Sequence, residues 1–362
     1  MSFSAADHRF MQQALELAAR GLYTTTPNPR VGCVIVKDGD VVGTGWHEKA
    51  GLQHAEVLAL SEAGARARGA TLYLNLEPCS HYGRTPPCAD AIVAAGVARV
   101  VASMLDPNPK VAGAGFAGLR AAGMRVESGL MEEEARELNI GFVARMARGR
   151  PWVRMKIAAS LDGRTALANG KSQWITGEAA RADGHRWRAR ACAVLTGVGT
   201  VRDDDPQLDV RGIETPRQPL RIVVDSKLEI SPAARLLKGG QALVVGAVND
   251  AKKIAALEAA GAEVALIPNE RGKVELFDLM QELARREFNE IHVEAGAKLN
   301  GSLLQAGVVD ELLVYLAPSL IGDSGRGMLH LPELTGLSQA TPLTIRGVER
   351  IGADLRILAR TG

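Results

Sequence analysis

The chain has few of the features that mark membrane-bound, secreted or nucleic-acid-binding proteins. No apolar run is long enough to cross a bilayer, and the N-terminus lacks the hydrophobic core of a signal peptide. Four cysteines, at positions 33, 79, 88 and 192, do not form a disulfide framework, which favours a reducing compartment. A net charge of +2 and an aromatic content of 4% offer little for binding phosphate backbones or unpaired bases. We therefore expect a cytoplasmic protein that binds neither nucleic acid nor membranes.

Three short segments carry the side chains of a hydrolytic zinc site. His54 precedes Glu56 by two residues, and two further candidate ligands follow, Cys79 after a proline and Cys88. A catalytic zinc keeps three protein ligands and leaves the fourth position to water. The pattern H-x-E followed by P-C and a second cysteine is that of zinc deaminases, in which the carboxylate is the general acid and base. The sequence predicts one zinc ion held by His54, Cys79 and Cys88.

Glu56 is expected to move protons rather than to bind the metal. One imidazole and two thiolates roughly neutralise Zn²⁺, which still lowers the pKa of bound water to about 7. A carboxylate beside that water should have a raised pKa, which suits transfer of a proton to a ring nitrogen and a departing amine. The predicted helix from Ala55 to Ala65 places His54 and Glu56 at its first turn.

The spacing of the cysteines departs from the general deaminase pattern. That pattern separates them by two residues, whereas eight residues separate Cys79 from Cys88 here. The insert is polar and rich in turn residues, so we expect a loop over the site. It contains His81, which could compete as a ligand. A structural zinc site is the other alternative, although such a site is normally closed by a fourth ligand.

The length and the order of predicted elements indicate two domains of α/β class. In the first we expect helices at 7–20, 55–65, 89–95, 116–122 and 131–146, and strands at 31–36, 40–46, 71–76 and 98–104. These form a three-layer unit with the metal site between a strand end and two helix starts. The basic stretch from Ala147 to Pro151 is the boundary candidate, giving domains 1–147 and 148–362.

The second half alternates apolar strands with helices, which predicts a mostly parallel sheet with crossover helices. Strands are expected at 152–159, 193–196, 220–225, 242–246, 263–267, 290–294 and 311–318, and helices at 179–190, 251–260 and 276–287. Glycine-rich segments at 196–200 and 294–301 each follow a strand. They could admit a phosphate to backbone N–H groups at a helix start, or they could be tight turns that serve packing only.

The whole chain from about residue 7 resembles the bifunctional deaminase–reductase family of riboflavin biosynthesis. The first half carries the strings Thr26-Pro27-Asn28-Pro29, His54-Ala55-Glu56-Val57, Glu77-Pro78-Cys79-Ser80-His81 and Asp106-Pro107-Asn108-Pro109. The second half carries Ser160-Leu161-Asp162-Gly163-Arg164-Thr165, Ser172-Gln173-Trp174-Ile175-Thr176, Asp204-Asp205-Pro206 and Val293-Glu294-Ala295-Gly296. The eight-residue cysteine spacing is normal in this family, so the departure noted above supports the resemblance.

The resemblance implies two consecutive reactions on one small molecule. A cytidine-deaminase-like N-terminal domain would hydrolyse the ring amino group of 2,5-diamino-6-hydroxy-4-(5-phosphoribosylamino)pyrimidine. A C-terminal domain similar to dihydrofolate reductase would then reduce the ribosyl group to ribityl with NADPH. The cofactor residues carried over by position are Ala158, Trp174, Thr200, Asp204, Ser226, Gly296, Ala297, Lys298, Leu299, Asn300, Gly301 and Ser302.

The resemblance also implies residues that bind the pyrimidine phosphate. They are Asn28, Lys156, Ser172, Arg188, Leu208, Arg211 and Glu294. Arginines suit a phosphate, and a glutamate at a strand end can accept hydrogen bonds from ring amines. From the residues alone, a tryptophan such as Trp174 would more often pack in the core than bind a ligand, and Lys156 could equally face the substrate or extend to solvent.

A second function class shares the zinc motif. A nucleic-acid deaminase, such as a transfer-RNA adenosine editor, would use His54, Glu56, Cys79 and Cys88 in the same roles. It would not need a second domain of this size, and the near-neutral charge opposes it.

For the deaminase–reductase, the expected partner is the small-molecule substrate, with a homo-oligomer as the expected assembly.

Overall fold

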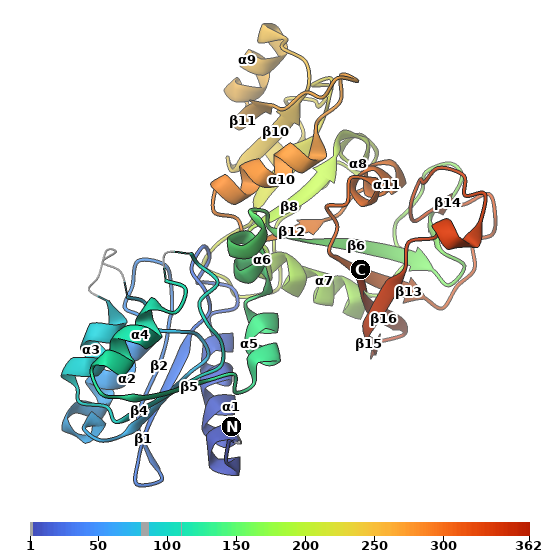
Figure 1. Ribbon diagram of the computed structural model, residues 1–362. Helices are drawn as coiled ribbons and strands as arrows, with labels where there is room; N and C mark the ends of the chain where they lie inside the picture. Colours follow the sequence, from blue (N-terminus) through green and yellow to red (C-terminus); the bar gives the residue numbers. More distant parts are fainter. Residues whose placement is uncertain (1–2, 81–86, 110) are drawn as a thin grey trace. The chain divides into compact units, whose positions relative to one another are not determined.

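The computed structural model describes residues 3–80, 87–109 and 111–362, in two units, Met1–Gly149 and Arg150–Gly362. His81, the competing ligand candidate, lies outside the described residues. The first unit contains a five-stranded sheet with the order β2-β1-β3-β4-β5 (Figure 1). Its strands are β1 (Gly32–Lys37), β2 (Asp40–Trp46), β3 (Thr71–Leu74), β4 (Arg99–Ala102) and β5 (Arg125–Ser128). β1 is antiparallel to both β2 and β3, so β2, β3, β4 and β5 all run in one direction.

Helices cover both faces of this sheet. One apolar cluster joins α1 (Ala5–Ala19) and α5 (Glu132–Leu138) to one face, and a second joins α2 (Ala55–Ala63), α3 (Cys88–Ala94) and α4 (Ala114–Ala121) to the other. The predicted three-layer arrangement is confirmed.

The helix that carries His54 and Glu56 packs unusually close to strand β2. A Cβ atom at Gly43 or Gly45 would lie 2.2 Å from a carbonyl oxygen of α2, that of Ala59 or of Ala55. Larger residues on this strand would push α2 away from the sheet, because protein interiors have no spare volume. The two glycines therefore set the depth at which the start of α2 lies.

The prediction of a single helix at 131–146 is wrong. The structure has two helices, α5 and α6 (Ile140–Arg148), separated at Asn139. The buried Asn139 amide accepts a hydrogen bond from the Arg30 backbone N–H (2.7 Å) and donates one to the Arg30 carbonyl (3.0 Å). These bonds hold Asn139 in a non-helical conformation (φ −106°, ψ 21°), which ends one helix and starts the next.

Strand β5 was not predicted.

The second unit is built on a nine-stranded sheet with the order β11-β10-β9-β8-β12-β6-β13-β16-β15. The first seven strands in that order are parallel, and the last two form an antiparallel hairpin. The parallel strands are β6 (Trp152–Ser160), β8 (Ala193–Gly197), β9 (Leu220–Val224), β10 (Ala242–Gly246), β11 (Ala262–Leu266), β12 (Glu290–Val293) and β13 (Glu311–Ala317). The predicted mostly parallel sheet is thus present.

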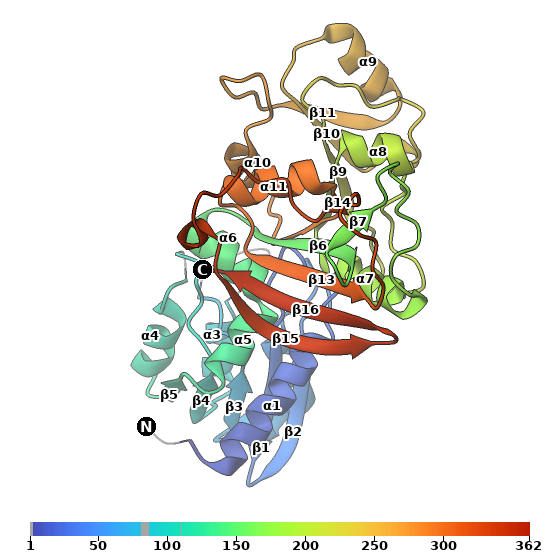
Figure 2. The same ribbon diagram turned by 90° about the vertical axis from the view of Figure 1, so that its right-hand side faces the viewer.

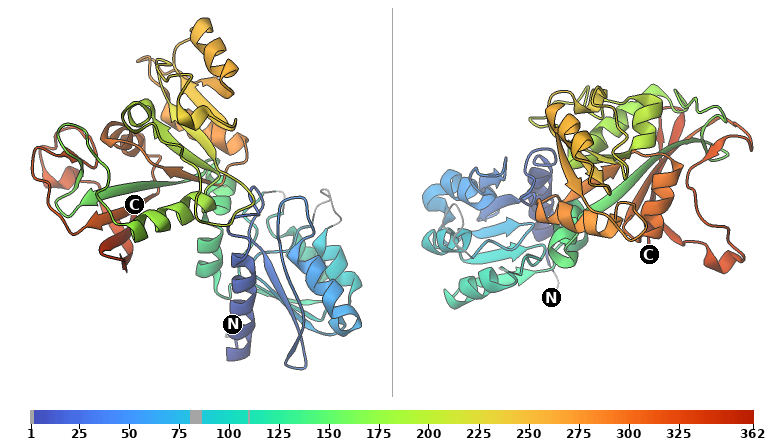
Figure 3. Two further views of the ribbon diagram at one scale, coloured as in Figure 1. Left: turned by 180° about the vertical axis from the view of Figure 1, so that it is seen from behind. Right: turned by 90° about the horizontal axis from the view of Figure 1, so that it is seen from above.

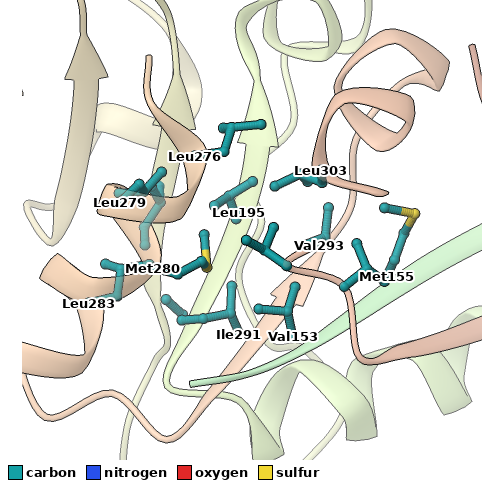
Figure 4. Close-up of a cluster of buried hydrophobic side chains, with 14 of the residues drawn as sticks. Val153, Met155, Leu195, Leu276, Leu279, Met280, Leu283, Ile291, Val293 and Leu303 are labelled. Atoms are coloured by element: carbon teal, nitrogen blue, oxygen red, sulfur yellow. The ribbon is translucent and has the colours of Figure 1, made fainter. Parts of the chain in front are cut away.

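The two faces of this sheet differ in chemistry. Figure 4 shows the apolar face, where Val153 and Met155 of β6 and Ile291 and Val293 of β12 pack with leucines of α10 (Leu276–Arg285) and α11 (Ala297–Gln305). The opposite face is covered by α7 (Glu178–Arg190), which runs alongside β6 in Figure 1 and, in yellow-green, in the left view of Figure 3. Charged side chains lie under α7, including Arg154, Glu290 and Glu311, all buried.

Several elements of the second unit were not predicted. The C-terminal hairpin of β15 (Leu343–Ile351) and β16 (Asp354–Thr361) extends the sheet (Figure 2), although most of β15 is exposed. The other unpredicted elements are α8 (Val198–Asp204) and a small sheet of β7 (Arg164–Ala166) and β14 (Arg326–Gly327). α9 (Ala251–Ala259) begins and ends within one residue of its prediction. Across the residues that the structure describes, no helix combines the length and apolarity needed to cross a bilayer.

A buried ionic network ties α1 to the sheet of the first unit. Asp7 accepts hydrogen bonds from Arg99 (2.6 Å), Tyr73 (2.8 Å) and Ser4 (2.7 Å), and Arg99 also bonds Glu127 (2.6 Å). Burial raises the pKa of Asp7, but the hydrogen bonds, that of Arg99 foremost, outweigh it and hold the pKa well below its ordinary value. The charged carboxylate therefore stabilises the fold.

We expect Asp7→Asn to lower the stability of the first unit by about 2–4 kcal/mol, since the amide cannot accept all these bonds. Because the folded-state pKa is lowered, the carboxylate contributes fully above its unfolded pKa of about 4, and this contribution is lost as the pH falls. Amide hydrogen exchange in β3 and β4 should show a constant difference from the parent above about pH 5 and a shrinking one below about pH 4. A difference that grows towards low pH would contradict this assignment.

Candidate active sites

The three predicted zinc ligands come from two helix starts and one strand end. His54 is the N-cap residue of α2, and Cys88 is the first residue of α3. Cys79 follows the carboxyl end of β3 and the Glu77-Pro78 turn. Since β2 and β3 run in the same direction, the chain segments that leave them meet at one edge of the sheet. The fold therefore brings together residues that are up to 34 positions apart.

The distances between these side chains fit a tetrahedral metal. Nδ1 of His54 lies 3.2 Å from Sγ of Cys88 and 3.6 Å from Sγ of Cys79. Zinc bonds of ordinary length at tetrahedral angles would separate a nitrogen and a sulfur ligand by about 3.6 Å. All three ligand atoms lie within 4.8 Å of one another. One nitrogen and two sulfurs are a donor set that zinc prefers, so the residues present fit the ion.

The surroundings of Cys79 favour the thiolate form of its side chain. Hydrogen bonds from the Cys88 side chain, from His54 and from the Cys88 backbone N–H (3.3 Å) lower the pKa of Cys79 to about 4, although burial opposes them. Cys88 starts α3, where the helix dipole and the unpaired N–H groups favour negative charge. The hydrogen bond that the Cys88 thiol donates to Cys79, together with burial, nevertheless raises the pKa of Cys88, so the two sulfurs share one proton that zinc binding would displace.

Glu56 lies in the first turn of α2, buried beside the ligands. Only 4% of the residue is exposed, and it also interacts with the Cys88 side chain. Burial raises the pKa of Glu56, and the charge on His54 opposes this shift. Among the described residues, the group that could hold a metal comprises His54, Cys79 and Cys88 without Glu56. This placement fits a carboxyl group that exchanges protons.

Glu77 organises the turn that carries Cys79, and sequence reasoning assigned it no role. Its carboxylate accepts three backbone N–H bonds, from Asp106 (3.1 Å), Gly113 (2.9 Å) and Phe116 (3.2 Å). The start of α4 approaches so closely that a Cβ atom at Gly115 would lie 2.2 Å from the Pro78 carbonyl oxygen. The turn before Cys79 is thereby fixed to the loop after β4. The signal in the sequence that could have identified Glu77 is the position of an acidic residue directly before the Pro-Cys pair.

Asn28 is held at the same site by a residue that sequence reasoning missed. Its Nδ2 donates to Nε2 of His47 (3.0 Å), and Nδ1 of His47 donates to the Gln53 carbonyl (3.1 Å). The His47 ring also meets the His54 ring edge to face, with centroids 5.4 Å apart. His47 therefore links the predicted substrate residue Asn28 to the segment that presents His54. No spacing pattern distinguishes this histidine in the sequence.

In the second unit, two helices without side-chain caps begin at neighbouring strand ends. Gly197 is the N-cap of α8 after β8, and Gly296 is the N-cap of α11 after β12; neither start is capped by a side chain. A Cβ atom at Gly296 would meet only Thr200 Oγ1, at 3.8 Å, so the space beside this glycine is open. An open, uncapped helix start at strand carboxyl ends fits the phosphates of NADPH.

The segment from Gly296 to Ser302 does not act as one surface. Gly301 packs against another loop, since a Cβ atom there would lie 1.9 Å from the His330 carbonyl oxygen. Asn300 is buried and donates to the Ala295 (3.2 Å) and Met328 (3.4 Å) carbonyls. The more accessible members of the segment are Gly296, Ala297, Lys298, Leu299 and Ser302. Packing thus accounts for Gly301, whereas it does not account for Gly296.

The other predicted cofactor residues lie on several elements of this unit. Ala158 is on β6, and Thr200 and Asp204 are on α8. Ser226 follows β9, and its Oγ accepts the Val274 backbone N–H (3.1 Å). Trp174 is 70% exposed, and the Arg181 guanidinium lies over its ring, 4.7 Å from the centroid, so core packing is excluded for this residue.

The predicted substrate residues of the second unit form a charged cluster and a second group, and the two adjoin at Asp209. Arg188 makes two hydrogen bonds to the Glu294 carboxylate, and Lys156 Nζ lies 3.7 Å from Glu294 Oε2. Lys156 therefore faces Glu294 and does not extend to solvent. Burial raises the pKa of Glu294, but the charges of Arg188 and Lys156 outweigh it and hold the pKa well below its ordinary value.

The second group surrounds the loop after α8. Arg211 bonds Asp209 Oδ1 (2.8 Å), and its backbone N–H donates to His185 Nδ1 (3.2 Å). Ser172 Oγ lies 3.4 Å from Asp204 Oδ1, which places a predicted substrate residue beside a predicted cofactor residue. Leu208 is buried, so a ligand would reach its backbone rather than its side chain.

Comparison with known proteins identifies the family. The chain matches the family model described as the RibD C-terminal domain over residues 151–357, more than half its length. The chain belongs to the RibD family. A second model, the cytidine and deoxycytidylate deaminase zinc-binding region, matches residues 4–104. The riboflavin biosynthesis protein RibD of Escherichia coli is 49% identical over 96% of this chain and 98% of its own, and that of Haemophilus influenzae is 46% identical over 99% and 98%.

Solved RibD structures have the same fold along the whole chain. RibD of Acinetobacter baumannii (form 1) is 43% identical, covers 99% of both chains and superimposes with a TM-score of 0.91. A Thermotoga maritima protein described as a diaminohydroxyphosphoribosylaminopyrimidine deaminase/5-amino-6-(5-phosphoribosylamino)uracil reductase is 32% identical, covers 99% of both chains and has a TM-score of 0.89. Membership in the RibD family confirms a zinc-dependent deaminase joined to an NADPH-dependent reductase.

We expect Cys88→Ser to lose most of its zinc, because a serine hydroxyl is a far weaker ligand than a thiolate. Metal analysis of the purified variant measures this directly. Cys192→Ser is the matched control, since Cys192 lies in the second unit and should leave the zinc content unchanged. Full zinc occupancy in Cys88→Ser would remove Cys88 from the ligand set.

Proposed function

We propose that the first unit deaminates 2,5-diamino-6-hydroxy-4-(5-phosphoribosylamino)pyrimidine and that the second unit reduces the ribosyl group of the product with NADPH. The observation that carries this proposal is the meeting of His54, Cys79 and Cys88 beside the buried Glu56, in a RibD-family chain. We assign deamination to residues 1–147 and reduction to residues 148–362. The homo-oligomer and the cytoplasmic location remain predictions.

The deamination needs one water molecule and releases ammonia. When bound by these three residues, zinc would act as a Lewis acid and would lower the pKa of its bound water to about 7. The carboxylate of Glu56 takes one proton from the attacking water and gives it to the ring nitrogen. It then takes the second proton from the hydroxyl group added to the ring carbon and gives it to the amine, which leaves as ammonia. Asn28, fixed by His47, can orient the pyrimidine by hydrogen bonds from a preset position. The close packing of α2 on Gly43 and Gly45 keeps Glu56 at a fixed depth.

The reduction uses a cofactor and a substrate that lie along adjacent strand ends. NADPH supplies the hydride, and the uncapped starts of α8 and α11 are suited to hold its phosphates. Arg188 and Arg211 provide positive charge for the substrate phosphate, and Lys156 faces the substrate site while paired with Glu294. Glu294, kept ionised by its neighbours, can accept hydrogen bonds from the ring amines.

The nucleic-acid deaminase is not favoured. The RibD C-terminal domain accounts for residues 151–357, which an RNA editor of this type would not require. The proposed deaminase–reductase function uses both halves of the chain on one small-molecule substrate.

We expect Glu56→Gln to retain zinc but to lose deaminase activity by several orders of magnitude, because proton transfer contributes roughly 10²–10⁴-fold and the amide cannot transfer protons. Ammonia release from the diaminopyrimidine substrate measures the loss. Reduction of already deaminated substrate is the internal control and should continue at the parental rate. Parental ammonia release would refute the role of Glu56.

We expect Gly296→Val to weaken NADPH binding sharply while leaving zinc content and deamination intact. The open space beside Gly296 should accept the side chain in the free protein but not together with the pyrophosphate. Titration of NADPH, with a thermal melt as a check of folding, measures the effect. Unchanged affinity in a folded variant would mean that the loop is a packing turn and that the cofactor binds elsewhere.

A further inference from the structure

The sheet face under α7 carries a group of buried ion pairs beside a small apolar cluster of Ala180, Leu313 and Tyr315. Arg154 on β6 bonds Glu290 (3.2 Å) and Glu311 (2.5 Å), and Arg190 on α7 also bonds Glu290 (2.6 Å). Further along β12, Glu294 bonds Arg188. Between these two carboxylates, on the same side of β12, lies His292. Strand alternation places Glu290, His292 and Glu294 in one row.

His292 is completely buried, and its ring nitrogens make no regular hydrogen bond with the described residues. Its exposed fraction is 0%, and both Nδ1 and Nε2 lack a partner of ordinary geometry. Oε1 of Glu294, a hydrogen-bond acceptor, lies 3.5 Å from Nε2. Burial lowers the pKa of His292, which favours a neutral ring with a single N–H. An unsatisfied buried donor is costly, so this N–H calls for an explanation.

The explanation lies in the two tasks of Arg188. In the ligand-free protein its guanidinium satisfies both oxygens of Glu294, and its third nitrogen donates to the Asp209 carbonyl (2.9 Å). If Arg188 turns the Nε–Nη2 edge of its guanidinium to the substrate phosphate, it gives up its two bonds to Glu294. Lys156, 3.7 Å from Oε2, remains beside that oxygen. Oε1 then depends on a second donor, and His292 Nε2 is the group beside it.

We propose that His292 is a positioning residue of the reductase site, which donates from Nε2 to Oε1 of Glu294 and holds this carboxylate in place when Arg188 turns to the substrate. This role rests on the proposed function, since it requires Glu294 to bind the pyrimidine. His292 touches neither substrate nor cofactor. Its effect reaches the substrate through the orientation of Glu294 and should appear in the KM for the pyrimidine.

The test compares His292→Leu, which has no donor, with His292→Gln, which keeps an N–H at similar reach. With deaminated substrate, 5-amino-6-(5-phosphoribosylamino)uracil, His292→Leu should raise the KM about tenfold, the typical effect of losing a hydrogen bond to a charged group. His292→Gln should restore most of the parental KM. The NADPH affinity, the zinc content and the deaminase activity should not change in either variant.

Tyr315→Phe is the matched control for damage to the buried polar layer. It removes the bond from the Tyr315 hydroxyl to Asp183 (2.6 Å) on the same sheet face, without touching Glu294. It should lower the melting temperature and leave the KM unchanged. If His292→Leu and His292→Gln raise the KM equally, or if Tyr315→Phe raises it as much as His292→Leu does, His292 has only a structural role and the inference is overturned.

Glu294→Gln separates this inference from the proposed function. A raised KM in Glu294→Gln together with a parental KM in His292→Leu overturns only the role of His292. A parental KM in Glu294→Gln overturns the assignment of Glu294 to the substrate, and with it the inference. Should His292→Leu fail to fold, the KM of His292→Gln against that of His292→Asn, whose shorter side chain cannot reach Oε1, decides the question.

Discussion

The functional groups of both units depend on one constraint, that a helix following a parallel strand begins at the carboxyl edge of the sheet. His54 and Cys88 lie at the starts of α2 and α3, and Gly197 and Gly296 cap α8 and α11. Free N–H groups and the helix dipole concentrate positive potential at such edges. In the first unit this potential favours a thiolate, and in the second it suits a phosphate. One geometric rule thus serves two unrelated chemistries.

The parts of the molecule that the sequence predicts well are those that depend on local signals. The motif residues His54, Glu56, Cys79 and Cys88 were found because their spacing reflects a tetrahedral donor set, and the structure does bring the three ligands together. Strands such as Ala242–Gly246 were found because they are continuously apolar. The two halves were separated by their different order of elements, which agrees with the α/β class of both.

The parts that escaped prediction depend on partners far away in the chain. Asn139 ends a helix because it bonds the backbone of Arg30, 109 residues earlier, and nothing in the local helical pattern of 131–146 reports this. The hairpin of β15 and β16 was missed because β15 is exposed along most of its length and lacks the alternation of a half-buried strand. Likewise, Glu77 and His47 acquire their roles only from backbone groups that the fold brings to them.

The layer of charges under α7 has an energetic cost that an apolar layer would avoid. Buried ion pairs such as Arg154–Glu290 and Arg154–Glu311 lose hydration on folding, and aliphatic replacements of similar volume are often as stable or more so. Arg190 of α7 joins this layer through a bond to Glu290 (2.6 Å), and the direction of that bond favours one placement of α7 on the sheet. Arg188 on that helix and Glu294 beyond β12 meet in consequence of this placement. By contrast, the opposite face of the sheet, which packs with α10 and α11, consists of aliphatic side chains.

Two buried carboxylates show how these environments assign different tasks to the same side chain. Around Glu56, burial dominates and raises the pKa, and a zinc ion neutralised by two thiolates would add little net positive charge. Glu294 is also mostly buried, with 14% of its side chain exposed, but Arg188 and Lys156 outweigh the effect of burial and keep the group charged. The first carboxyl group is therefore protonated more readily than an ordinary glutamate, which suits proton transfer, whereas the second is held in its charged, hydrogen-bond-accepting form. The difference lies in the cations that the fold places beside each glutamate.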